Sequence, residues 1–282
     1  MAGLRELAKQ LESVRMTGQM ASAVKTAAAV KFSQISAALT AFGSYAAVCR
    51  DMRRRFGSAL AEAFPVKDPS APRCFVLFGA NRGLSGGYSI RLYEFADRLL
   101  AEAGEHRLIV TGRHAANRYE GAGASRVFIL PDIPAAEHTA AVLDHVLDLY
   151  EKGEVSSVEL IFQRFINTLR QEPACSVLLP LAAGDTEPDS RWDEIIFMPD
   201  RETVLGAAAE ACVRADLTAA MLEAAAGLQA ATLVAMRAAS DNADKSAAEL
   251  ESEIAHRRQS EVTSGVLETA GGNAVRGTDA QS

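Results

Sequence analysis

The 282-residue chain has no proline outside its middle, because all nine prolines lie between Pro65 and Pro199. A proline inside a helix costs about 3 kcal/mol, so residues 1–64 and 200–282 can each form a long helix. Both stretches are rich in alanine and have helical patterns. The sequence therefore predicts two long helices at opposite ends of the chain, with a globular segment inserted between them.

Signals for secretion, membrane insertion and metal binding are also lacking. No window approaches the roughly 18 consecutive apolar residues of a membrane span. The first turns of the chain carry charges, unlike a secretory signal. The four cysteines show neither CxxC nor Cys/His ligand spacing, so we expect buried free thiols and no metal site; they are Cys49, Cys74, Cys175 and Cys212.

Catalytic and cofactor motifs are missing as well. The five histidines show no HExxH spacing, and Ser85 lies in LSG and not in a GxSxG turn. The loop FGANRGLSGGYS has the glycine spacing GxxxGxxGG, whereas a dinucleotide loop needs GxGxxG. A GxxxxGK[ST] phosphate loop is absent too. We therefore predict no catalytic residue and no cofactor, and expect the glycines to serve a tight turn or a contact with another protein.

Charge is divided unevenly between the two ends, although the net charge is −7. Residues 1–60 hold nine basic residues and three acids, whereas residues 202–282 hold six basic residues and twelve acids. Opposite charges favour pairing of the two helices and leave a basic face on the first. The basic residues are widely spaced and lack interleaved aromatics, so we expect an acidic protein surface as the partner, not nucleic acid.

Both ends carry a heptad pattern. From Leu205 to Ile254, small or apolar residues recur in steps of three and four, as in a coiled-coil seam. Alanine dominates this seam, so the two helices can approach closely. The first helix offers a matching series: Leu4, Leu7, Leu11, Val14, Gly18, Ala21, Val24, Ala28, Phe32, Ile35, Leu39, Phe42, Ala46 and Cys49.

An antiparallel arrangement follows from this pattern. We expect Leu7–Val24 alongside Leu233–Ile254, and Ile35–Cys49 near Leu205–Leu222. A compact helical bundle is the alternative, but it needs turn signals within the helical ends, and neither proline nor Gly/Asn clusters supply them.

The central segment alternates strands with helices. Short β-rich runs lie at Cys74–Phe78, Leu108–Thr111, Val127–Leu130, Val158–Phe162 and Ser176–Leu181. Helical patterns lie at Tyr88–Ala103, Ala115–Glu120 and Ala135–Lys152. This order predicts a mostly parallel sheet with right-handed crossovers. The fold class is thus α/β, a long antiparallel coiled coil of the terminal helices with an inserted Rossmann-like α/β domain. The expected domains are 1–64, 65–199 and 200–272, followed by a flexible tail at 273–282.

Several segments resemble the gamma subunit of the F-type ATP synthase. The first helix matches that family's opening helix at Ser13, Val14, Thr17, Ala23, Ala28 and Lys31. FGANRGLSGGYS is similar to the family's GSDRGLCGGLN, and IIFMPD to its YIYEPD. Near the C-terminus, RQSEVTSGVLETAGG is similar to RQAxITxELxEIxxG. These matches keep their order and spacing over nearly the whole chain.

The resemblance implies a non-catalytic central-stalk rotor that couples proton or sodium flow to ATP synthesis or hydrolysis. The implied partners are the alpha and beta subunits of the catalytic head, the epsilon subunit and the membrane rotor ring. The implied location is the cytoplasmic side of the cell inner membrane, as a peripheral protein. Family methionines are replaced by Val24 and Thr26, so the rotor of a paralogous ATPase complex is an alternative. An enzyme with helical arms and a coiled-coil adaptor are the others.

Ten residues are expected to contact other subunits. Three adjacent arginines are expected near the lower end of the shaft, where a crowded subunit junction would supply acidic neighbours. The remaining candidates lie on the basic helix face, in the glycine loop and in the C-terminal motif. The complete set is Lys25, Lys31, Arg53, Arg54, Arg55, Arg82, Gly83, Gly86, Gln259 and Thr263.

Overall fold

The computed structural model describes residues 2–121, 123–181 and 196–278. The chain divides into two compact units, one made of residues 1–26 and 236–282 and the other of residues 27–235. Two long helices contribute to both units: α1 (Ala2–Glu62) and α5 (Arg201–Thr278).

The first unit is an antiparallel pair of helices. Arg15 of α1 forms an ion pair of 2.5 Å with Glu251 of α5. A Cβ atom added to Gly18 would lie 3.0 Å from the Cβ of Ala243, so the backbones approach closely at a small-residue seam. The predicted pairing of the N-terminal stretch with the end of the C-terminal helix is therefore confirmed. Buried seam residues here are Leu7, Gly18, Ala21, Ser240, Ala247 and Ile254.

The second unit contains a five-stranded sheet with the order β3-β2-β1-β4-β5. Neighbouring strands are parallel except β4 and β5, which form an antiparallel hairpin. The mostly parallel α/β prediction is thus confirmed. The strands are β1 (Arg73–Phe78), β2 (His106–Thr111), β3 (Ala124–Phe128), β4 (Ser157–Phe165) and β5 (Gln171–Leu179).

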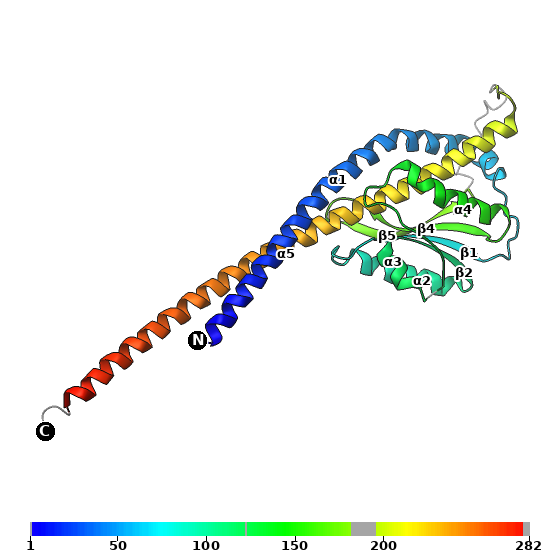
Figure 1. Cartoon of the computed structure of the whole chain (residues 1–282). Helices are drawn as coiled ribbons and strands as arrows, with labels where there is room; N and C mark the ends of the chain where they lie inside the picture. Colours follow the sequence, from blue (N-terminus) through cyan, green and yellow to red (C-terminus); the bar gives the residue numbers. More distant parts are fainter. Residues whose placement is uncertain (1, 122, 182–195, 279–282) are drawn as a thin grey trace. The chain divides into compact units, whose positions relative to one another are not determined.

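Helices cover both faces of this sheet (Figure 1). One face packs against α2 (Tyr88–Ala103) and α3 (Arg113–Tyr119). The other packs against α4 (Ala140–Glu151) and the first part of α5. Strand residues alternate between the two cores, since Phe75 and Leu77 belong to one while Cys74 and Val76 belong to the other. This alternation explains why the strands appear as continuous apolar runs.

Part of α5 is a core helix of the second unit. Leu217, Ala226 and Ala230 are fully buried there, and the same helix contacts α1, as shown by Cys212 Sγ donating to the carbonyl of Cys49 at 3.5 Å. One stretch of α5 is long and, on average, apolar enough to cross a membrane by length and composition, although the sequence has no run of about 18 consecutive apolar residues. That stretch is 44% buried within the protein, and the core helix of a soluble protein passes the same test.

Several boundaries differ from those predicted. Phe56 has non-helical φ and ψ angles of −121° and 18°, so α1 is kinked there and is not one unbroken helix. Gly57 and Ser58 follow directly, and Gly/Ser pairs are a common cause of kinks. The helix expected at 135–152 is instead a 3-10 turn, η1 (Ala136–Thr139), followed by α4.

The two ends of α5 lie near the predicted limits. The helix begins at Arg201 and continues past residue 272 to Thr278. The last four residues of the expected tail, 279–282, lie outside the described part of the chain.

Candidate functional site

Loops that follow three parallel strands lie at the same edge of the sheet in the second unit. Carboxyl ends of parallel strands share an edge, where α/β proteins commonly place their binding residues. The loops are the glycine loop (79–87) after β1, segment 129–134 after β3, and the turn 166–170 after β4. We call these three loops the collar.

A chain of polar contacts joins the first two collar loops to α1. The Asn81 amide donates to the carbonyl oxygen of Leu130 at 2.7 Å and to Asp132 Oδ1 at 3.1 Å. The other Asp132 oxygen accepts from Lys31 Nζ at 2.5 Å. The bond from Lys31, followed by that from Asn81, outweighs partial burial and lowers the pKa of Asp132. Asp132 is therefore a carboxylate held between a helix and a loop.

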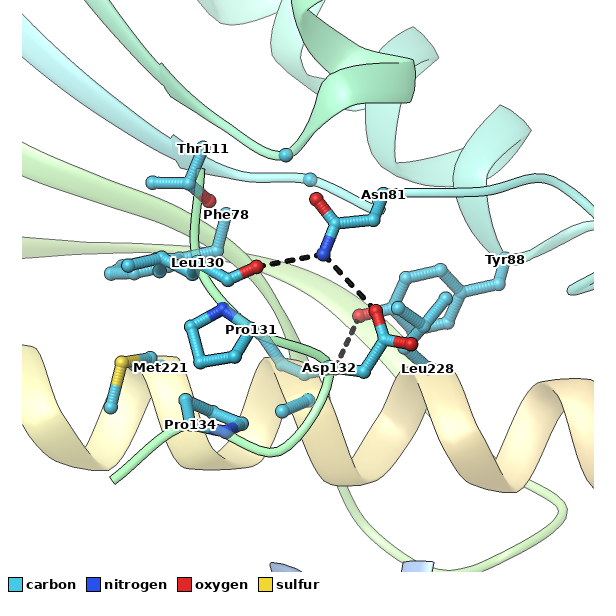
Figure 2. A pocket seen from close by; sticks show the side chains of 14 residues that line it. Phe78, Asn81, Tyr88, Thr111, Leu130, Pro131, Asp132, Pro134, Met221 and Leu228 are labelled. Carbon is cyan, nitrogen blue, oxygen red and sulfur yellow. Dashed lines mark hydrogen bonds between the residues drawn. The ribbon is translucent and has the colours of Figure 1, made fainter. Parts of the chain in front are cut away.

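A small cavity of about 40 Å³ lies beside these residues. Figure 2 shows Asn81 and Asp132 facing each other, with α5, which carries Met221 and Leu228, running below them. Ligand pockets for small molecules and cofactors usually measure about 300–1,000 Å³. This cavity is thus smaller than such pockets, and the absence of a nucleotide site stays a prediction from the spacing of the glycines.

The outer side of the glycine loop is exposed and has a strained backbone. Arg82, Gly83 and Gly86 are all exposed, as predicted contact residues must be. Leu84 between them is 61% exposed and has a φ of 71°, a left-handed conformation that is uncommon for a side chain of its kind. Strain of this type is concentrated at binding and switch sites.

The turn at 166–170 presents a second exposed apolar tip. Leu169 at this turn is 80% exposed. The base of the turn is held on both long helices, because the Phe165 amide donates to Glu223 Oε2 at 3.4 Å and the rings of Phe32 and Phe165 lie 5.8 Å apart. Basic and apolar side chains together on rigidly held loops are suited to a protein partner.

Four of the predicted contact cations already have acidic partners within the chain. Lys31 pairs with Asp132, as described above. Arg53 pairs with Asp216 at 2.5 Å, and both are less than one-third exposed. Burial raises the pKa of Asp216 despite the opposing effect of Arg53.

Asp51 accepts ion pairs from both Arg54 and Arg55, at 2.5 Å and 2.8 Å. Carboxylates on α1 and α5 thus pair with all three arginines, so these cations do not require acidic neighbours from another subunit. Their role in a subunit contact remains a prediction.

The remaining predicted residues lie in the first unit. Lys25 is half-buried, whereas Gln259 and Thr263 are exposed on α5. The Thr263 hydroxyl donates to the carbonyl oxygen of Gln259 at 2.9 Å, a bond within the helix. The collar residues thus belong to the second unit and these three to the first.

The sequence did not reveal the roles of Asn81 and Asp132, nor the bond of 2.8 Å that the Tyr88 hydroxyl donates to the carbonyl oxygen of Ala224 in α5. Asn81 and Asp132 are far apart in the sequence, and only the sheet order places β1 and β3 so that their following loops meet. The four cysteines are free thiols; Cys49, Cys74 and Cys212 are buried as expected, whereas Cys175 is only half-buried. Over the described ranges, the structure contains no cluster of three or more histidine, cysteine, aspartate or glutamate side chains that could bind a metal.

Comparison with known proteins gives a consistent result. A family model described as ATP synthase matches residues 3–275. The ATP synthase gamma chain of Paraburkholderia phymatum is 31% identical, over 98% of this chain and 100% of the relative. That of Methylococcus capsulatus is 32% identical with the same coverage. The fold is similar to a chain of the Euglena gracilis mitochondrial ATP synthase, with a TM-score of 0.69, 17% identity, and coverage of 100% of this chain and 97% of that one. The chain belongs to the ATP synthase gamma chain family.

Proposed function

We propose that this chain is the central-stalk rotor subunit of an F-type ATP synthase. In this role it transmits rotation between a membrane rotor ring, driven by protons or sodium ions, and the alpha and beta subunits of the catalytic head. The observation that carries the proposal is the match to gamma chains over their full length, combined with antiparallel helix pairing. The fold is also similar to that of a chain in the central stalk and c-ring of the Tetrahymena thermophila mitochondrial ATP synthase, with a TM-score of 0.56, 17% identity, and coverage of 78% of this chain and 99% of that one.

The seam geometry supports a shaft. Small residues such as Gly18 and Ala243 let the two helices approach closely, which keeps the pair thin enough to lie inside a ring of other subunits. Ion pairs between the helices, such as Arg15 with Glu251, join the two faces. A shaft acts by shape and stiffness, so the chain would itself make and break no bonds in ATP.

The collar supports contacts with the head. Arg82 offers a cation and Leu84 an exposed apolar side chain at a loop fixed by Asn81. We place the acidic loops of the alpha and beta subunits against the collar. The epsilon subunit and the rotor ring would contact the second unit elsewhere. The protein would then be peripheral to a membrane, on the cytoplasmic side of the cell inner membrane.

Reconstitution tests the proposal. The chain is co-expressed with the alpha, beta, epsilon and membrane subunits encoded in the same genome, and the complex is placed in vesicles. We expect the chain to co-purify with the head in fixed proportion and to be required for ATP-driven ion pumping. A complex that pumps equally well without the chain would contradict the proposal. Assembly only with a second, paralogous set of subunits would assign the chain to that complex instead.

A further inference from the structure

We propose that Tyr88 and Gly227 form the contact through which the α/β domain holds α5 against twisting. Both are positioning residues, and the inference rests on the proposed rotor function. In a rotor, a twisting force must pass between the sheet domain and the long helix. At Tyr88 and Gly227, a side chain of the sheet domain fits into a gap in the surface of the long helix.

Tyr88 is tied to the structure at both of its ends. Its side chain is 1% exposed, and its hydroxyl donates to the carbonyl oxygen of Ala224 in α5 at 2.8 Å. Its main-chain oxygen accepts a bond of 3.0 Å from the Gln163 amide, which is fully buried in β4. The first residue of α2 is thereby fixed to the sheet on one side and to α5 on the other (Figure 2 shows the ring beside α5).

Gly227 provides the space that the tyrosine ring occupies. A Cβ atom at this position would lie 3.3 Å from Tyr88 Cε2 and 3.2 Å from Gln171 Cγ, both closer than ordinary van der Waals contact. Gln171 cannot withdraw freely, because its amide donates to the carbonyl oxygens of Asn167 and Thr168 at 3.0 Å and 3.1 Å. The ring and the glutamine therefore fill a notch in α5 that exists only because residue 227 has no side chain.

A filled notch resists rotation better than the alanine-rich surface around it. Packed interiors transmit strain where side chains interdigitate, while a smooth row of methyl groups offers little resistance to sliding. Turning α5 about its axis would move Gly227 away from the ring and bring neighbouring side chains such as Leu228 against it. The bond from Tyr88 to Ala224 would break in the same motion.

Glycine-to-alanine substitution tests the notch. In the reconstituted complex, Gly227→Ala should lower the number of ions pumped per ATP hydrolysed by about two- to tenfold, with hydrolysis retained. The matched control is Gly206→Ala in the same helix, where an added Cβ meets no atom within 4 Å. Both changes raise helix propensity equally, so only the notch differs. Unchanged pumping per ATP in Gly227→Ala would overturn the inference.

A second variant identifies the tyrosine as the partner. Tyr88→Leu removes the ring and the hydroxyl, so it should also lower pumping per ATP. In the double variant Tyr88→Leu with Gly227→Ala, the methyl group enters space vacated by the ring, and the loss should be smaller than the product of the two single losses. If Gly227→Ala does not assemble, normal coupling in Tyr88→Leu would overturn the inference by itself. Failure of the unaltered complex to pump would instead count against the rotor function.

Discussion

The helix α5 has two differently buried regions, although its sequence is alanine-rich in both. From 205 to 235, in the second unit, it lies between α1 and the sheet, and residues such as Leu217 and Ala226 are fully buried. From 236 to 264, in the first unit, the buried side chains are Ser240, Ala247 and Ile254, spaced seven apart. The heptad seam is thus common to both regions, whereas burial on a second side belongs to one.

Residues 205–235 of α5 therefore belong to a hydrophobic core, whereas residues 236–264 are buried only along the seam of a two-helix coiled coil. Burial contributes about 25 cal/mol per Å² of apolar surface, and ordering each residue costs about 1–2 kcal/mol of backbone entropy. A two-helix seam of small residues offsets that cost poorly, while the region packed on the sheet gains apolar contacts on both sides. In the isolated protein, we expect the first unit to open far more readily than the second.

Amide hydrogen exchange of the isolated chain should show the largest effect. Amides of residues 210–230 should exchange at least about a hundredfold more slowly than those of residues 240–260, because local opening is easier where few apolar contacts exist. Mass spectrometry of peptic fragments measures both regions in one sample. Equal exchange rates of the amides along α5 would contradict the expected difference in stability and would indicate that the two-helix seam is stable without other subunits.

Leucine truncation should distinguish the two regions by stability. Leu217→Ala removes a fully buried side chain and should lower the free energy of unfolding by about 2–5 kcal/mol. Leu250→Ala, at a half-buried seam position, should cost less than half as much. Urea denaturation followed by circular dichroism measures both variants. A larger loss for Leu250→Ala would mean that the seam, not the sheet contact, holds α5.

The bond from Lys31 to Asp132 should give a smaller effect that depends on pH. Lys31→Met should reduce stability by about 1 kcal/mol at pH 7. Folding lowers the pKa of Asp132, so its contribution is present above the ordinary aspartate pKa of about 3.9 and is lost as the pH falls through the lowered value. The two proteins should therefore become equally stable in strong acid. A difference that persists below pH 2 would show that packing, and not charge, accounts for the loss.

Thiol reactivity should give the smallest effect. Burial and the neighbouring Cys49 raise the pKa of Cys212 to about 11, and both thiols lie in the α1–α5 contact of the second unit. We expect them to react with a soluble disulfide reagent more slowly in the folded protein than in urea. A cysteine introduced into the first unit, by Ser252→Cys at an exposed position of α5, should react in the folded protein as fast as it does in urea. Fast reaction of Cys212 in the native protein would show that the second unit opens as readily as the first.

Helices were predicted well from the sequence where their apolar residues repeat with a single helical period. The helix Tyr88–Ala103 has the predicted bounds, and the seam positions are buried or half-buried because steps of three and four place them on one helix face. The kink at Phe56 was missed, since a Gly/Ser pair is a weak signal beside the absence of proline. Two-sided burial of α5 was missed because an alanine on the outer face looks the same whether a sheet covers it or not.

The site was predicted only in part. The glycine loop could be recognised because its motif is contiguous, and Arg82, Gly83 and Gly86 are exposed as expected. The partners of Lys31 and Arg53 could not be found, because Asp132 and Asp216 reach them only through tertiary packing. The role of Gly227 could not be predicted either, because Tyr88 and Gln171 approach it only through tertiary packing.

Rotation of the chain relative to an immobilised catalytic head tests the central claim most directly. A marker is attached through Glu105→Cys, at an exposed turn between α2 and β2, in a complex whose alpha and beta subunits are immobilised on glass. We predict continuous rotation of the marker in one direction when ATP is added, at a rate that follows hydrolysis. A complex that hydrolyses ATP while the marker fluctuates without net rotation would contradict the rotor function.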